Sequence, residues 1–119
     1  MSETGDTAKT LEDYINMAEG VKRVANNKGL YLRLLKNFIA KPHIQELLGA
    51  IEQGDFKTAA LEAHTIKGVA ANLSFPELYA VMQNLESELK EGKTAGFDLA
   101  LAQSCVETTI KYADQLIAG

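Results

Sequence analysis

Residues 59–73 read AALEAHTIKGVAANL and have the periodicity of an amphipathic helix. Apolar residues recur at spacings of three and four, which is the pattern of a helix that buries one side against its neighbours. This apolar stripe consists of Ala59, Ala63, Ile66, Ala70 and Leu73. Because most of its members are alanines, we expect another helix to approach it closely.

His64 lies on the other side of the same helix. At about 100° per residue, it projects roughly 140° from the centre of the stripe, and Gly68 projects nearly opposite to the stripe. Lys67 and Gly68 follow His64 by three and four residues, so both lie on its face one turn further along. The sequence therefore predicts a solvent-facing imidazole beside an ammonium group and a bare stretch of backbone.

Helical spacing recurs along most of the chain, and no segment has the pattern of a strand. Two short stripes near the N-terminus are Leu11, Tyr14, Ile15 and Ala18, and then Val21, Val24 and Ala25. Three longer stripes are Leu30, Leu34, Leu35, Phe38, Ile39, Leu47, Leu48 and Ile51; Leu78, Val81, Met82, Leu85 and Leu89; and Leu99, Ala102, Cys105, Val106, Thr109, Ile110, Ala113 and Leu116. With residues 59–73 they predict an all-α fold, an antiparallel up-down four-helix bundle with short N-terminal helices, because this arrangement buries all the long stripes.

Pro42 interrupts the long helix expected over residues 30–53. A proline inside a helix removes a hydrogen bond and bends or breaks the helix locally. We therefore expect a kink near Lys41. His43 follows at this kink without the lysine and glycine that accompany His64, and we interpret it as a surface histidine.

Other residues predict where helices end and begin. Gly54-Asp55 predicts a helix stop followed by the N-cap of the helix that carries His64. Ser74 predicts the N-cap of the following helix, with proline in its first turn and Glu77 in the capping-box position. The last helix is expected to begin near residues 95–98.

The composition fits one globular domain, since 46% of the 119 residues are hydrophobic and 24% are charged. Residues 1–9 are polar and are expected to form a flexible tail, whereas residues 10–119 are expected to form one helical domain. The polar tail and the start at Met1 favour a free-standing protein. The small size of the expected exposed apolar surface favours a monomer.

The charge and the cysteine content exclude several classes of function. A net charge of -4 and a pI of about 5.1 provide no basic surface for nucleic acid. No stretch approaches the roughly 20 apolar residues that cross a membrane, and no secretory signal is present, so a cytoplasmic location is expected. Cys105 is the only cysteine, which excludes an internal disulfide and a cysteine-based zinc site and favours a buried thiol.

No nucleotide-binding motif of the Walker type or another glycine-rich type occurs in the chain. The protein is therefore not expected to be an enzyme with its own ATP site. The two histidines lack the Glu-x-x-His spacing of a di-iron bundle, and neither a metal nor another cofactor is expected.

The run from Glu62 to Leu73 strongly resembles the signature of histidine-containing phosphotransfer (HPt) domains, which has His-x-x-Lys-Gly at its core. The resemblance covers the chain from about Tyr14 to the C-terminus. Equivalents of other family segments are residues 29–38, the turn Gly54-Asp55-Phe56 and residues 85–89.

The resemblance implies a phosphorelay intermediate that accepts a phosphoryl group from the aspartyl phosphate of one receiver domain and donates it to another. His64 would carry the group, because a neutral imidazole is available as a nucleophile near pH 7. Lys67 would neutralise charge on the phosphoryl oxygens. Glu86 aligns with a polar family position, commonly glutamine, and would orient the ring or pair with Lys67. The implied partners are response-regulator receiver domains and a hybrid sensor kinase, and any magnesium would belong to the receiver.

Gly68 and its surroundings predict a docking surface for a protein. A glycine in the middle of a helix costs about 1 kcal/mol relative to alanine, so helix stability does not explain its presence. Because Gly68 points away from the stripe, we expect the backbone of a partner to approach it. Leu61, with Ala60 and Ala71 at its edges, extends this surface unless the adjoining helices cover these residues.

Two positions depart from the family pattern. Val69 replaces a small serine or alanine, and Ser74 replaces a glycine at the end of the helix. We expect local packing and partner choice to change at these positions while phosphotransfer is retained. The alternative to a carrier is a helical adaptor that binds a receiver or kinase without carrying phosphate, and a structural bundle of unrelated role would bind no receiver.

Overall fold

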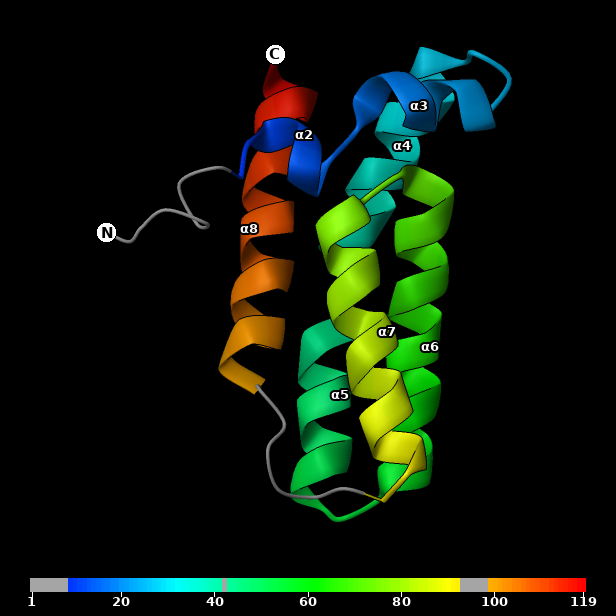
Figure 1. Cartoon of the computed structure of the whole chain (residues 1–119). Helices are drawn as coiled ribbons and strands as arrows, with labels where there is room; N and C mark the ends of the chain where they lie inside the picture. Colours follow the sequence, from blue (N-terminus) through cyan, green and yellow to red (C-terminus); the bar gives the residue numbers. More distant parts are fainter. Residues whose placement is uncertain (1–8, 42, 93–98) are drawn as a thin grey trace.

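The computed structural model describes residues 9–41, 43–92 and 99–119, and all the regular structure in these ranges is helical (Figure 1). The helices are α2 (Leu11–Tyr14), α3 (Met17–Arg23), α4 (Lys28–Ala40), α5 (His43–Glu52), α6 (Phe56–Leu73), α7 (Pro76–Lys90) and α8 (Leu99–Ala118). The all-α prediction is confirmed. None of these helices is long and apolar enough to span a bilayer.

The long helices form an antiparallel up-down bundle (Figure 1). Helices α4 and α5 run down one side in succession, α6 returns, α7 descends beside α6, and α8 rises to the C-terminus. The short helices α2 and α3 cover the end of the bundle at which α6 passes into α7. This arrangement confirms the predicted bundle with short N-terminal helices.

The predicted stripes supply the core. Every member of the α6 stripe is buried, and its packing partners come mainly from α7 and α5. The buried members of the α7 and α8 stripes are Leu78, Met82, Leu85, Leu89, Ala102, Cys105, Val106, Thr109 and Ala113. Burial raises the pKa of the Cys105 thiol to about 11, in agreement with the predicted buried cysteine. In the N-terminal stripes, Ile15 is buried, whereas Ala18 and Ala25 are exposed, against expectation.

The helix expected over residues 30–53 is two helices rather than one kinked helix. Helix α4 ends at Ala40, and Lys41 has extended backbone angles (φ -94°, ψ 137°), as a residue before proline prefers. Pro42 itself lies outside the described residues. The surface position predicted for His43 is wrong, because its side chain is buried and stacks on Phe38 with ring centroids 5.6 Å apart. This burial lowers the pKa of His43.

The turn before α6 follows the sequence signals. Gly54 has a left-handed backbone (φ 76°), and the carboxylate of Asp55 accepts a hydrogen bond from the Thr58 amide at 3.1 Å. The N-cap predicted at Ser74 is wrong. Ser74 ends α6 in the left-handed conformation (φ 60°, ψ 61°), and Phe75 is the N-cap residue of α7.

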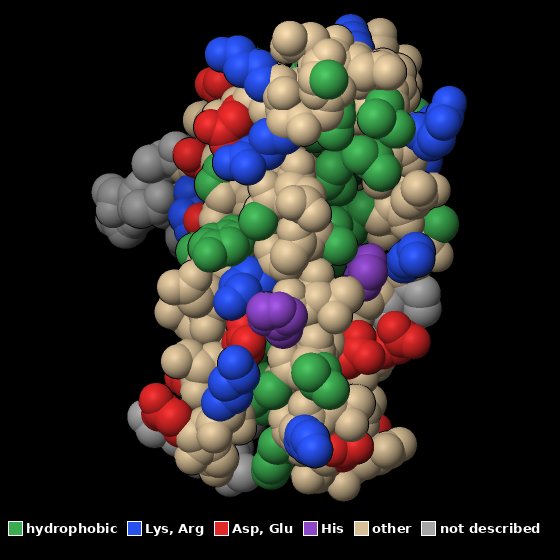
Figure 2. Space-filling model, turned by 90° about the vertical axis from the view of Figure 1, so that its right-hand side faces the viewer, with side chains coloured by type: hydrophobic (Ala, Val, Ile, Leu, Met, Phe, Trp, Pro, Cys, Tyr) green, Lys and Arg blue, Asp and Glu red, His purple; other side chains and the backbone are tan. Residues whose placement is uncertain are grey.

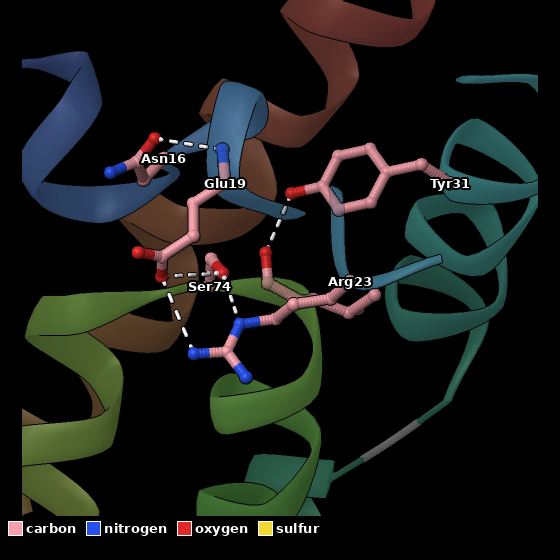
Figure 3. A network of polar contacts seen from close by, with 6 residues as sticks. Asn16, Glu19, Arg23, Tyr31 and Ser74 are labelled. Carbon is pink, nitrogen blue, oxygen red and sulfur yellow. Dashed lines mark hydrogen bonds and ion pairs between the residues drawn. The ribbon is translucent and has the colours of Figure 1, made fainter. Parts of the chain in front are cut away.

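Long-range contacts join helix α4 and the start of α3 to the end of α6 (Figure 3). The Tyr31 hydroxyl donates to the Leu73 carbonyl at 2.7 Å, and the Asn16 amide donates to the Ser74 carbonyl at 2.8 Å. The Ser74 hydroxyl donates to Glu19 instead of capping α7. The position of Ser74 is therefore set by contacts with α3 that the local sequence pattern does not contain.

The flexible tail predicted for residues 1–9 lies almost entirely outside the described residues. Lys9, its last residue, forms an ion pair with Glu77 at the start of α7. The predicted start of the last helix at residues 95–98 also lies outside the described part of the chain.

Candidate functional site

His64 lies midway along α6 and points away from the core. Its side chain is 61% exposed, which confirms the exposure predicted from the helical spacing. On the face shown in Figure 2, the more central of two histidines projects from the surface with both basic and acidic side chains beside it. An imidazole in this setting is accessible to a reacting group on another protein.

Glu86 of α7 holds the imidazole from one side. The His64 Nδ1 atom lies 3.1 Å from the Oε2 atom of Glu86, whose side chain is only 6% exposed. An ionised carboxylate accepts hydrogen bonds and donates none, so Nδ1 carries the proton in this contact. In the neutral ring the other nitrogen, Nε2, then has a free lone pair.

Two lysines neutralise the buried carboxylate. The ammonium groups of Lys67 and Lys90 each lie 2.8 Å from an oxygen of Glu86, Lys67 at Oε1 and Lys90 at Oε2. These cations, Lys67 first, hold the pKa of Glu86 down at about 2, and Glu86 in turn raises the pKa of Lys67. Glu86 is therefore anionic at neutral pH and keeps the Nδ1–H tautomer of His64 favourable.

The structure thus gives Glu86 both of the arrangements that the sequence left open, since it contacts the ring and pairs with Lys67. Sequence reasoning missed Lys90. Its spacing of four residues after Glu86 on a predicted helix was the available signal, because such pairs lie side by side on a helix surface.

Gly68 is exposed one turn beyond His64. A Cβ atom built on Gly68 meets no atom within 4 Å outside its own helical turn. No internal contact among the described residues therefore requires glycine at this position, in contrast to Gly20, where a Cβ would lie 2.3 Å from the Tyr31 ring.

Leu61 is an exposed apolar residue, with 61% of its surface accessible. It borders a hollow of about 530 Å³ that extends to His64 and is mainly apolar. Other residues that line it include Phe56, Lys57, Leu89 and Lys90. We call it the lower hollow.

The two alanines expected at the edges of this surface are placed differently. Ala60 is buried at 7% exposure, because α7 lies against this side of α6, so it lines the floor of the lower hollow rather than an exposed rim. Ala71 is half-buried and lines a different hollow, further along α6. Val69 is half-buried and packs on the edge of the core, as expected for a bulkier residue.

Comparison with known proteins identifies the family. The family model described as "Hpt domain" matches residues 33–118, so the chain belongs to the Hpt domain family, the histidine phosphotransfer domains of phosphorelays. Members of this family are typically phosphocarriers rather than kinases.

A solved structure has the same fold. It is the HPT domain of an Hpt sensor hybrid histidine kinase from Shewanella, which aligns with a TM-score of 0.80 and 17% sequence identity. The alignment covers 92% of this chain and 97% of that one. A search of curated proteins gave no match.

Proposed function

We propose that His64 carries a phosphoryl group between the aspartates of receiver domains. The observation that carries this proposal is the contact of Glu86 with Nδ1, which leaves Nε2 exposed and unprotonated in the neutral ring. The membership of the Hpt family supports the same chemistry.

The reacting groups of the transfer are the imidazole of His64 and the aspartyl phosphate of the receiver domain. The Nε2 lone pair attacks the phosphorus of an aspartyl phosphate, the new N–P bond forms as the bond to the aspartate oxygen breaks, and the aspartate leaves as a carboxylate. The ring keeps its proton on Nδ1 and becomes positively charged. Glu86 stabilises that charge at 3.1 Å, and donation to a second receiver reverses these steps.

Lysines are placed to stabilise the transferred group. Lys67 lies one turn from His64 on the same helix, and Lys90 reaches the same carboxylate from α7. Each can direct an N–H donor at phosphoryl oxygens on Nε2 while remaining near Glu86, because a lysine ammonium has three donors. Gly68 leaves the helix backbone open to the approaching receiver.

The partners we propose are receiver domains of response regulators and a hybrid sensor kinase. The exposed Leu61 and the apolar lower hollow support a protein partner rather than a small molecule alone. The comparison with the Shewanella HPT domain, which is part of a sensor hybrid kinase, supports the same class of partner.

The test is incubation with a panel of receiver domains that carry radiolabelled aspartyl phosphate. We expect acid-labile, base-stable label on the wild type and on His43→Gln, and none on His64→Gln. His43 is the matched control because it is the other histidine of the chain. Binding to a receiver that is retained by His64→Gln, without label on the wild type, would instead establish the adaptor function.

A further inference from the structure

A second hollow, of about 430 Å³, lies further along the α6–α7 groove. We call it the upper hollow. Its lining includes Glu19 and Arg23 of α3, Ala71 of α6 and Tyr79 of α7, together with Ser74 at the end of α6. Ala71 follows His64 by seven residues, so it lies about 10 Å along the helix axis and on nearly the same side. The two hollows therefore flank His64 along one face of the molecule.

Arg23 is oriented at the upper hollow by contacts with Ser74 and Glu19 (Figure 3). Its Nε atom donates to the Ser74 hydroxyl at 3.1 Å, and its Nη2 atom lies 3.5 Å from Glu19 Oε1. The same Glu19 oxygen accepts a hydrogen bond from Ser74 at 3.1 Å. The guanidinium side chain is 52% exposed, and its Nη1 atom has no partner among the described residues.

Ser74, which hydrogen-bonds both Arg23 and Glu19, has a strained backbone conformation. Its φ of 60° is in the left-handed region, where glycine is unstrained and serine is not. The side chain that serine adds is buried, and both of its hydrogen bonds go to Arg23 and Glu19. The left-handed backbone of Ser74 therefore presents a hydroxyl that links Arg23 to Glu19 at the upper hollow.

We propose that the upper hollow is a second docking subsite, in which Arg23 binds a carboxylate side chain of the receiver domain that exchanges phosphate with His64. This proposal rests on the proposed function. A guanidinium presents planar donors that match a carboxylate, and one that is already oriented loses little entropy on binding. The phosphoryl group itself is handled at His64, which borders the lower hollow, so the ligand of Arg23 in the upper hollow belongs to the partner protein.

The proposal also gives this chain a means of selecting a receiver. Arg23 precedes residues 33–118, the part that matches the family model. A contact made by α3 lies outside the His64 site, and it can distinguish one receiver from another without altering the chemistry there.

The test measures the initial rate of phosphoryl transfer at increasing concentrations of the receiver domain that labels the wild type fastest. The variant is Arg23→Glu, and the matched control is Arg33→Glu, which reverses the charge of an exposed arginine on α4 that lines neither hollow. We expect Arg23→Glu to raise the half-saturating concentration about tenfold with the maximal rate unchanged, and Arg33→Glu to have no such effect.

Two further variants separate docking from folding. Arg23→Gln removes the charge without placing a second carboxylate beside Glu19, and Ser74→Gly releases Arg23 while relieving the strained backbone. We expect both to weaken docking while thermal unfolding shows a folded domain. Restoration of the wild-type value by Arg23→Glu together with a carboxylate-to-arginine change in the receiver would identify the ligand.

The outcomes distinguish this proposal from the proposed function. Equal half-saturating concentrations for Arg23→Glu, Arg33→Glu and the wild type would overturn the docking subsite alone. A lower maximal rate at an unchanged half-saturating concentration would also overturn it. Failure of every receiver to label the wild type would overturn both proposals.

Discussion

Glu86 joins His64 to two lysines through one carboxylate, with its Oε2 atom 3.1 Å from His64 Nδ1. The contact crosses from α7 to α6 and connects residues 22 positions apart in the sequence. It orients the imidazole with Nε2 outward, and the lysines keep the carboxylate charged. The buried carboxylate of Glu86 therefore determines that Nε2 is the nitrogen of His64 that is free to react.

The first prediction concerns the tautomer of His64. Loss of the carboxylate in Glu86→Ala removes the acceptor of the Nδ1 proton, so we expect the neutral ring to shift towards the Nε2–H tautomer that predominates in free histidine. Nitrogen-15 NMR of the imidazole measures this shift. Glu88→Ala, a change on the same helix that leaves the His64 contact intact, is the control. Identical His64 spectra in wild type and Glu86→Ala would contradict the assignment.

The second prediction concerns stability in acid. The pKa of Glu86 is about 2 in the folded protein, below its ordinary value of 4.5. A lowered folded-state pKa stabilises the protein above the unfolded pKa, and this stabilisation disappears as the pH falls towards the folded pKa. We expect the free energy of unfolding of the wild type to exceed that of Glu86→Gln by about 1 kcal/mol at pH 7, allowing for solvent screening at Lys90.

The measurement is urea unfolding of both proteins at several values of pH. The difference between them should decrease between about pH 5 and pH 2. A difference that is constant over this range would show that the ionised carboxylate does not contribute to stability.

The third prediction separates stability from function at Gly68. A Cβ meets nothing within 4 Å at Gly68 or at Gly49, which lies in α5 and lines neither hollow. Alanine at either position should raise the free energy of unfolding by up to about 1 kcal/mol, because alanine favours the helix. We expect only Gly68→Ala to slow phosphotransfer, since it is at Gly68 that we propose a partner approaches the backbone. Equal transfer rates for both variants would remove the argument for close approach at Gly68.

The fourth prediction concerns Gly20, where we expect alanine to destabilise the protein instead of stabilising it. A Cβ on this residue would lie 2.3 Å from Cε1 of the buried Tyr31 ring, whose hydroxyl is bonded to the Leu73 carbonyl. The ring cannot move without losing that hydrogen bond, so Gly20→Ala should lower the free energy of unfolding by about 1–3 kcal/mol. Thermal unfolding beside the Gly49→Ala control tests this. A Gly20→Ala protein more stable than the wild type would show that Gly20 does not pack tightly against the Tyr31 ring.

Much of the fold could be predicted from the sequence because its signals are local. The periodicity of α6 predicts both its buried alanines and the exposed side of His64, and Gly54-Asp55 predicts the turn before it. The prediction at Ser74 failed although the local signal was good. A serine three residues before glutamate can cap a helix, but here its hydroxyl bonds to residues of α3, more than 50 positions away.

The burial of His43 in the core likewise could not be predicted from local sequence. A histidine beside a helix-breaking proline has no local feature that predicts its burial. The separation of α4 from α5 places its ring on Phe38, and this stacking depends on the angle between two helices.

The sequence by itself determined that His64, Lys67 and Gly68 share one outward face, because the geometry of an α-helix relates residues three and four positions apart. Only the tertiary structure decided which groups act on that face from other helices. The approach of α7 placed Glu86 and Lys90 beside the imidazole, and the packing of α3 placed Arg23 beside Ser74 at the end of α6. Those placements depend on packing between residues distant in sequence, for which no spacing rule exists.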